Sequence, residues 1–179
     1  MARVLSSPPE RRPELESRFL RREATTMALY VSIVLLAALA ALPAGHEEGG
    51  SVDGPTGIEL IALLWGTTLG LAIAHSFAFV VATQGLGRGR LDAQERREAA
   101  AELAGAVVVA AVATVPILVL SEEAEQRVVP FVLALVIGVV GYLVERLNGR
   151  TRVASILFGT TTLVAGLLVA TVKNVLTGH

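Results

Sequence analysis

The sequence predicts an all-α, polytopic integral membrane protein with five transmembrane helices. Hydrophobic residues make up 53% of the 179 residues and charged residues only 17%, against about 25% charged residues in soluble domains. The apolar residues are gathered into blocks that contain no Asp, Glu, Lys or Arg. These blocks are residues 24–45, 60–87, 103–121, 128–144 and 153–172. Each reaches the ~17 to 25 residues that a spanning helix needs, and none shows the polar stripe of a soluble amphipathic helix.

The basic residues predict how these helices are oriented. With a cytoplasmic N-terminus, the segments on the cytoplasmic side hold 13 of the 15 basic residues. These are Arg3, Arg11, Arg12, Arg18, Arg21, Arg22, Arg88, Arg90, Arg96, Arg97, Arg146, Arg150 and Arg152. Short loops rich in Lys and Arg stay in the cytoplasm, so the predicted topology is N-in and C-out. The bias toward Arg, Ala, Gly and Val is typical of a GC-rich bacterial genome, and we expect a multi-pass protein of the bacterial inner membrane.

Two regions follow along the chain. Residues 1–22 form a basic, polar, cytoplasmic lead that is expected to be partly disordered, and residues 23–179 form the transmembrane domain. The helices of this domain are expected at about residues 24–43, 57–83, 99–120, 129–145 and 153–174. The lipid bilayer is therefore the first expected partner, and no feature indicates nucleic-acid binding.

Proline and glycine punctuate these helices. Pro43 ends the first helix, because proline cannot continue the backbone hydrogen-bond ladder. Pro116 is expected to kink the third helix, and Pro130 is expected in the first turn of the fourth, where its missing N–H costs nothing. Asn148 and Gly149 indicate a tight turn before the fifth helix.

The second helix carries small residues at every fourth position: Ala62, Gly66, Gly70, Ala74 and Ala78. Residues four apart share a helix face, and small residues let two helix backbones approach closely in a membrane. We therefore expect this helix to be the central and most buried one. A homo-oligomer through the second or fifth helix is also expected.

Two ionisable residues stand on the second helix, Glu59 at its outer start and His75 in its inner third. Both project toward the small-residue face, so both are expected to point toward protein. They are about 24 Å apart along the axis, which places them in different sites, and Glu102 at the base of the third helix is expected to approach His75. Intramembrane ionisable groups often mark ion or proton paths, and histidine exchanges protons near neutral pH. The alternative is a neutral imidazole that only links helices.

A row of carboxylates precedes the third helix: Asp92, Glu95, Glu98 and Glu102, spaced by three, three and four residues. On a helical extension they would share one face. Oxygen ligands of this kind suit Mn²⁺ and Mg²⁺, and in many sites Fe²⁺. The alternative is a solvated charged helix whose carboxylates pair with the neighbouring arginines. The sequence shows no nucleophile–base pair, phosphate loop or metal-hydrolase motif, so no enzymatic activity and no bound cofactor are expected.

Five helices with an acidic helical segment between the second and third resemble the vacuolar iron transporter family in layout. The C-terminal stretch GYLVERLNGRTRVASILFGTTTLVAGLLVATVKNVLTGH is similar in style to that family's last two helices. The resemblance covers most of the chain in topology and little of it in motif, and the first helix lacks the family's acidic residue. It implies a dimer that moves Fe²⁺ or Mn²⁺ out of the cytoplasm against protons, with Asp92, Glu95, Glu98 and Glu102 in its metal-binding segment.

Two functional hypotheses remain open at this point. The first is a divalent-cation transporter, or proton-coupled exporter, that uses Glu59, His75 and Glu102. The second is a non-transporting scaffold or partner subunit whose polar intramembrane residues only hold the helices together. Replacement of His75 separates them, because it stops flux in the first case and loosens the fold or the oligomer in the second.

Overall fold

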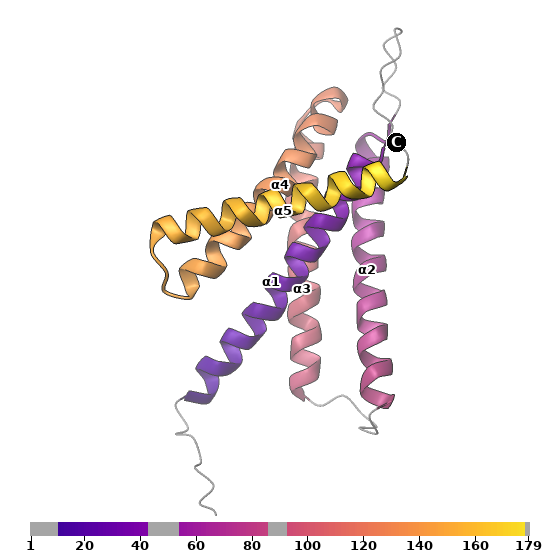
Figure 1. Ribbon diagram of the computed structural model, residues 1–179. Coiled ribbons are helices and arrows are strands. Elements are labelled where there is room, and N and C mark those ends of the chain that lie inside the picture. The colour runs from indigo at the N-terminus through magenta and orange to yellow at the C-terminus, as the bar shows by residue number, and fades with distance from the viewer. Residues whose placement is uncertain (1–10, 43–53, 86–92, 178–179) are drawn as a thin grey trace, which may run out of the picture.

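The computed structural model describes residues 11–42, 54–85 and 93–177, and these fold into five helices (Figure 1). The helices are α1 (Arg11–Ala40), α2 (Gly57–Gly85), α3 (Ala93–Val119), α4 (Glu122–Leu147) and α5 (Arg152–Thr177). No strand occurs in these three ranges, which confirms the all-α prediction. Helices α1 to α4 are long and apolar enough to cross a membrane, and the described apolar stretch of α5, Arg152–Leu168, is shorter.

Two helices begin earlier than the sequence predicts. Helix α1 begins at Arg11, so part of the expected polar lead is helical. Helix α4 begins at Glu122 with an acidic first turn, which the positive end of the helix dipole favours. Pro130 therefore lies in the third turn of α4 and not in its first. The helical start of α3 at Ala93 confirms the expected extension before the third span.

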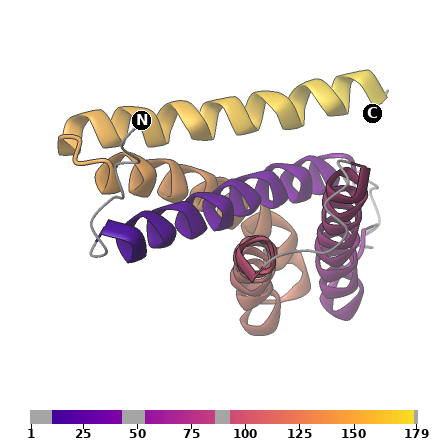
Figure 2. The ribbon, with the colours of Figure 1, turned by 90° about the horizontal axis from the view of Figure 1, so that it is seen from below.

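The central helix is α1, and the expectation that the second helix is central was wrong. Figure 2 shows α1 between α5 on one side and α2 and α3 on the other, and α1 packs mainly against α3, α4 and α5. Its Met27, Val31 and Leu35 belong to the buried core. Helix α2 packs mainly on α3 and only slightly on α1, through a stripe that starts at Leu60 and Leu64.

Helices α1 and α3 run parallel and touch where glycine permits it. A Cβ atom added to Gly105 would lie 3.0 Å from the carbonyl carbon of Ala24 and would overlap its oxygen. One end of the same pair of helices is tied by the ion pair between Arg97 and Glu16. Both pairs have the same offset of 81 positions along the chain, as a parallel alignment in constant register requires.

Helices α4 and α5 form an antiparallel hairpin that uses small residues in the way predicted for helix two. Its turn contains Gly149 with a positive φ of 76°. A Cβ atom on Gly159 would lie 2.7 Å from the carbonyl oxygen of Gly138, and one on Gly141 would lie 2.8 Å from Oγ1 of Thr162. The missing side chains thus allow backbone contact between the two helices. In Figure 1, α5 runs across the direction shared by α2 and α3.

Candidate functional site

The candidate site lies on the seam between the antiparallel helices α2 and α3. Two side-chain contacts define this seam. The indole Nε1 of Trp65 donates to Oγ1 of Thr114 at 3.0 Å, and Nε2 of His75 lies 3.3 Å from Oε2 of Glu102. The two contacts are separated by ten residues on α2 and by twelve on α3, which is the spacing that an antiparallel pair of helices requires.

The His75–Glu102 pair lies within the apolar part of α2 and one turn beyond the charged start of α3. The Glu102 side chain is 17% exposed and the His75 side chain 46% exposed. The pair is therefore held by α2 and α3 and stays accessible from one side. An imidazole and a carboxylate at this distance can share a proton, and both are ligands of divalent transition metals.

Glu59 takes no part in this pair. It lies in the first turn of α2, about 24 Å from His75 along the axis, and it is exposed. The expectation that it points toward protein is wrong for the single chain. A carboxylate in the first turn of a helix interacts favourably with the helix dipole, which accounts for its position.

The predicted carboxylate row does not gather into one cluster. Asp92 lies outside the described residues. Glu98 accepts a hydrogen bond from Nε2 of Gln94 at 3.0 Å, Glu95 is partly buried, and Glu102 faces His75. Among the residues that the structure describes, no three His, Cys, Asp or Glu side chains come together as metal ligands would. Of this row, the structure brings Glu102 to a second candidate residue, His75.

Glu125 is a buried carboxylate that the sequence analysis did not single out. It is 1% exposed, and it accepts a hydrogen bond of 2.5 Å from the backbone N–H of Gly57 at the start of α2. The first N–H groups of a helix have no partner within that helix, so a carboxylate from α4 supplies one. Glu125 lies on the same buried stripe of α4 as Val129 and Leu133, each four residues further on. This four-residue spacing is the feature of the sequence that could have predicted the burial of Glu125.

Replacing Glu125 with alanine is expected to lower the free energy of unfolding by about 2 kcal/mol, because the change leaves the backbone N–H at the start of α2 without its side-chain acceptor. Trp65 is the only tryptophan and lies on α2, so its fluorescence during thermal unfolding in detergent reports this change directly. Glu123→Ala is the matched control, since Glu123 is exposed in the same turn and its loss should stay within about 0.5 kcal/mol. Equal effects of the two changes would show that the contact contributes nothing.

The buried hydroxyl groups of Ser32, Thr68 and Ser155 each donate to the backbone carbonyl oxygen four residues earlier in the chain. Ser32 donates to the carbonyl oxygen of Ala28 at 2.7 Å, and Thr68 donates to that of Leu64 at 2.7 Å. On the seam, Thr114 donates to the carbonyl oxygen of Ala110 at 2.7 Å while it accepts from Trp65. The described part of a single chain therefore offers no row of free polar groups from the His75–Glu102 pair to the other end of α2.

The fold and the composition define the class of protein, an all-helical chain with four helices that are long and apolar enough for a membrane. The chain matches no protein-family model, no curated protein and no solved structure.

Proposed function

We propose that this protein moves a divalent cation, Fe²⁺ or Mn²⁺, across the membrane in exchange for protons, and that His75 and Glu102 form its binding site. The observation that carries the proposal is the contact of 3.3 Å between these two side chains in an otherwise apolar segment. Ionisable groups are rare in membrane segments, where they commonly mark ion and proton paths. An imidazole and a carboxylate can hold a transition metal, and a metal that arrives displaces their proton.

In this proposal the chain crosses the bacterial inner membrane five times, with its N-terminus in the cytoplasm and its C-terminus outside. The parallel packing of α1 and α3 supports this orientation. It brings Arg21 and Arg22 of α1 to the same end of the molecule as Arg96 and Arg97 of α3. Clusters of arginine at one end are the charge distribution of a cytoplasmic face. Helix α5 has 26 residues, which is sufficient length for a fifth span, and the proposal requires it to tilt from its crosswise direction toward that of α2 and α3.

The proposed assembly is a homodimer through α2. The small residues of α2 are exposed in the single chain, and no described heavy atom lies within 4 Å of a Cβ built at Gly66 or Gly70. The half-exposed imidazole of His75 belongs to the same helix. A polar side chain at membrane depth is more stable in contact with protein than in contact with lipid. A second copy of α2 would cover both the small residues and the imidazole of His75.

The double change Gly66→Leu and Gly70→Leu is expected to convert the dimer into a monomer, because the new side chains keep the two α2 backbones apart. Light scattering of the purified protein in detergent measures the mass. Ala111→Leu adds an equally large side chain at an exposed position of α3 and should leave the mass unchanged. A dimer that survives the double change would exclude α2 as the interface.

A second candidate function is a non-transporting scaffold. It is favoured by one observation, that the described polar groups along the α2–α3 seam are already bonded to one another or to their own helix. In this case the His75–Glu102 contact fixes the register of α2 against α3 and transports neither a metal ion nor a proton.

Flux through the purified protein in liposomes separates the two candidates. The vesicles hold a metal-sensitive dye, and Mn²⁺ or Fe²⁺ is added outside with and without a pH gradient. A transporter gives dye signal that exceeds that of protein-free vesicles and that changes with the gradient. If the folded protein gives no dye signal above that of protein-free vesicles with either metal, with or without the pH gradient, the transport proposal fails. The scaffold function is then the remaining candidate.

A further inference from the structure

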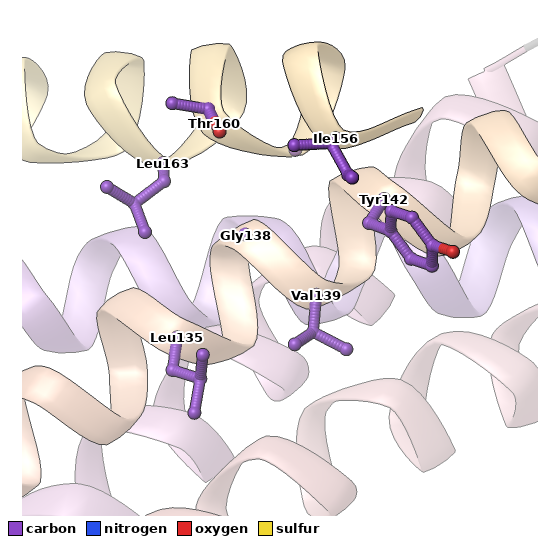
Figure 3. Close-up of a pocket in the computed structure, with 8 residues that line it drawn as sticks. Leu135, Gly138, Val139, Tyr142, Ile156, Thr160 and Leu163 are labelled. Carbon is purple, nitrogen blue, oxygen red and sulfur yellow. The ribbon is translucent and has the colours of Figure 1, made fainter. Parts of the chain in front are cut away.

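An open apolar groove of about 230 Å³ lies between α4 and α5, on the face shown in Figure 3. Its walls are mainly hydrocarbon: Leu135 and Val139 from α4 and Ile156 and Leu163 from α5. The exposed Leu135, Val139 and Ile156 give the groove an open side. The groove exists because α4 and α5 touch through glycines, which leave space between the larger neighbouring side chains.

One end of the groove is polar and adjoins the turn between the two helices. Tyr142 lines this end, and Arg146 follows it one turn later on α4. On α5, Arg152 precedes the lining residue Ile156 by one turn. Arg146 in the last turn of α4 and Arg152 at the start of α5 are therefore both exposed beside this turn. A groove that binds only another apolar helix does not require these charges.

The arginines of this turn outnumber its carboxylates. Nε of Arg150 lies 3.7 Å from Oε2 of Glu145; the Arg150 side chain is largely exposed and that of Glu145 is partly buried. Nη1 of Arg146 donates to the carbonyl oxygen of Arg150 at 2.7 Å, which leaves its charge uncompensated. Three arginines and one glutamate give the turn two net positive charges, on Arg146 and Arg152, for which the described part of the chain shows no carboxylate partner.

We propose that the groove and the turn together bind an anionic phospholipid. One acyl chain lies in the groove between α4 and α5, and the phosphate lies against Arg146 and Arg152. The guanidinium group suits this role because its planar N–H groups bind phosphate oxygens in pairs. The hydroxyl of Tyr142 marks the level between the two parts, as aromatic residues with a polar tip do at the membrane boundary.

The charge of the turn selects this occupant over the alternatives. A zwitterionic lipid carries its own cation next to the phosphate and gains less from two uncompensated arginines, whereas an anionic headgroup gains from each basic residue near the surface. The proposal does not depend on transport, since the groove lies on α4 and α5 and the His75–Glu102 pair lies on α2 and α3.

Lipid retention tests the proposal. The full-length protein, stripped of lipid in detergent, is mixed with dioleoyl phosphatidylglycerol or dioleoyl phosphatidylcholine, and bound lipid is counted by native mass spectrometry. The unmodified protein is expected to retain one phosphatidylglycerol per chain with roughly tenfold preference over phosphatidylcholine. Equal retention of the two lipids by the unmodified protein would overturn the proposal without any variant.

Two variants locate the site. Arg146→Gln with Arg152→Gln should abolish the preference for phosphatidylglycerol, and Leu135→Trp should reduce retention of both lipids because the indole fills the groove. Their controls are Arg96→Gln and Leu118→Trp on α3, which change exposed residues away from the groove and should leave retention unchanged. The same loss in a variant and its control would show that lipid binds the general surface, and the proposal would then fail.

Discussion

The change His75→Ala is expected to reduce Mn²⁺ and Fe²⁺ flux in liposomes to the level of protein-free vesicles. Alanine removes the imidazole that faces Glu102 at 3.3 Å, and with it half of the proposed ligand set and the proton exchanged for the metal. Glu102→Gln should have the same effect, since the amide keeps the shape of the side chain but carries no charge. Both rates are read with the dye assay at equal amounts of reconstituted protein.

Thermal unfolding of the two single variants distinguishes a binding site from a structural clamp. In a binding site, His75→Ala and Glu102→Gln remove flux while the unfolding temperature in detergent stays close to that of the unmodified protein. Ser76→Ala is the local control, because it alters an exposed neighbour on the same turn of α2. A His75→Ala protein that transports normally but unfolds at a lower temperature would assign the pair a purely structural role.

The largest stability effect is expected at Gly105. The change Gly105→Ala should lower the free energy of unfolding by about 3 kcal/mol, because the new methyl group would overlap the backbone of Ala24 where α1 and α3 touch. A backbone carbonyl cannot move aside as a flexible side chain would, so the two helices must separate. Unfolding in detergent followed by circular dichroism measures the loss.

The control for this change is Gly66→Ala, the same substitution on α2. No described heavy atom lies within 4 Å of a Cβ at that position, and alanine stays small enough for close helix packing. Alanine is favoured over glycine in a helix by up to about 1 kcal/mol, so this variant should be unchanged or slightly more stable. If Gly105→Ala unfolds like Gly66→Ala, the contact between α1 and α3 is looser than described.

The helices themselves could be predicted from the sequence, but the faces by which they pack could not. Apolar blocks of sufficient length between charged turns indicated all five helices. In a soluble helix a polar stripe shows which side faces water, whereas α2 is apolar all round and shows no such stripe. The small residues of α2 were therefore assigned to the interior, while its packed face carries Leu60, Leu64 and Thr68.

The candidate site was predictable where it depended on distance along helix axes. The rise per residue along each helix was sufficient to predict that Glu102 and His75 lie at the same depth. The structure places their side chains 3.3 Å apart. Glu125 was missed for a different reason. It lies in SEEAEQR, a run of polar residues that is typical of a turn, and only the earlier start of α4 puts it on the same stripe as Val129.

The central position of α1 has a consequence for how the chain is made. Helix α1 leaves the ribosome before α3, α4 and α5, the helices that bury it. The Ser32 hydroxyl of α1 donates to the carbonyl oxygen of Ala28, so this buried polar group is already satisfied before the other helices pack around it. Because α2 covers little of α1, stable assembly begins only when Gly105 of α3 reaches Ala24. A nascent chain that stops before α3 therefore leaves the buried face of α1 largely uncovered.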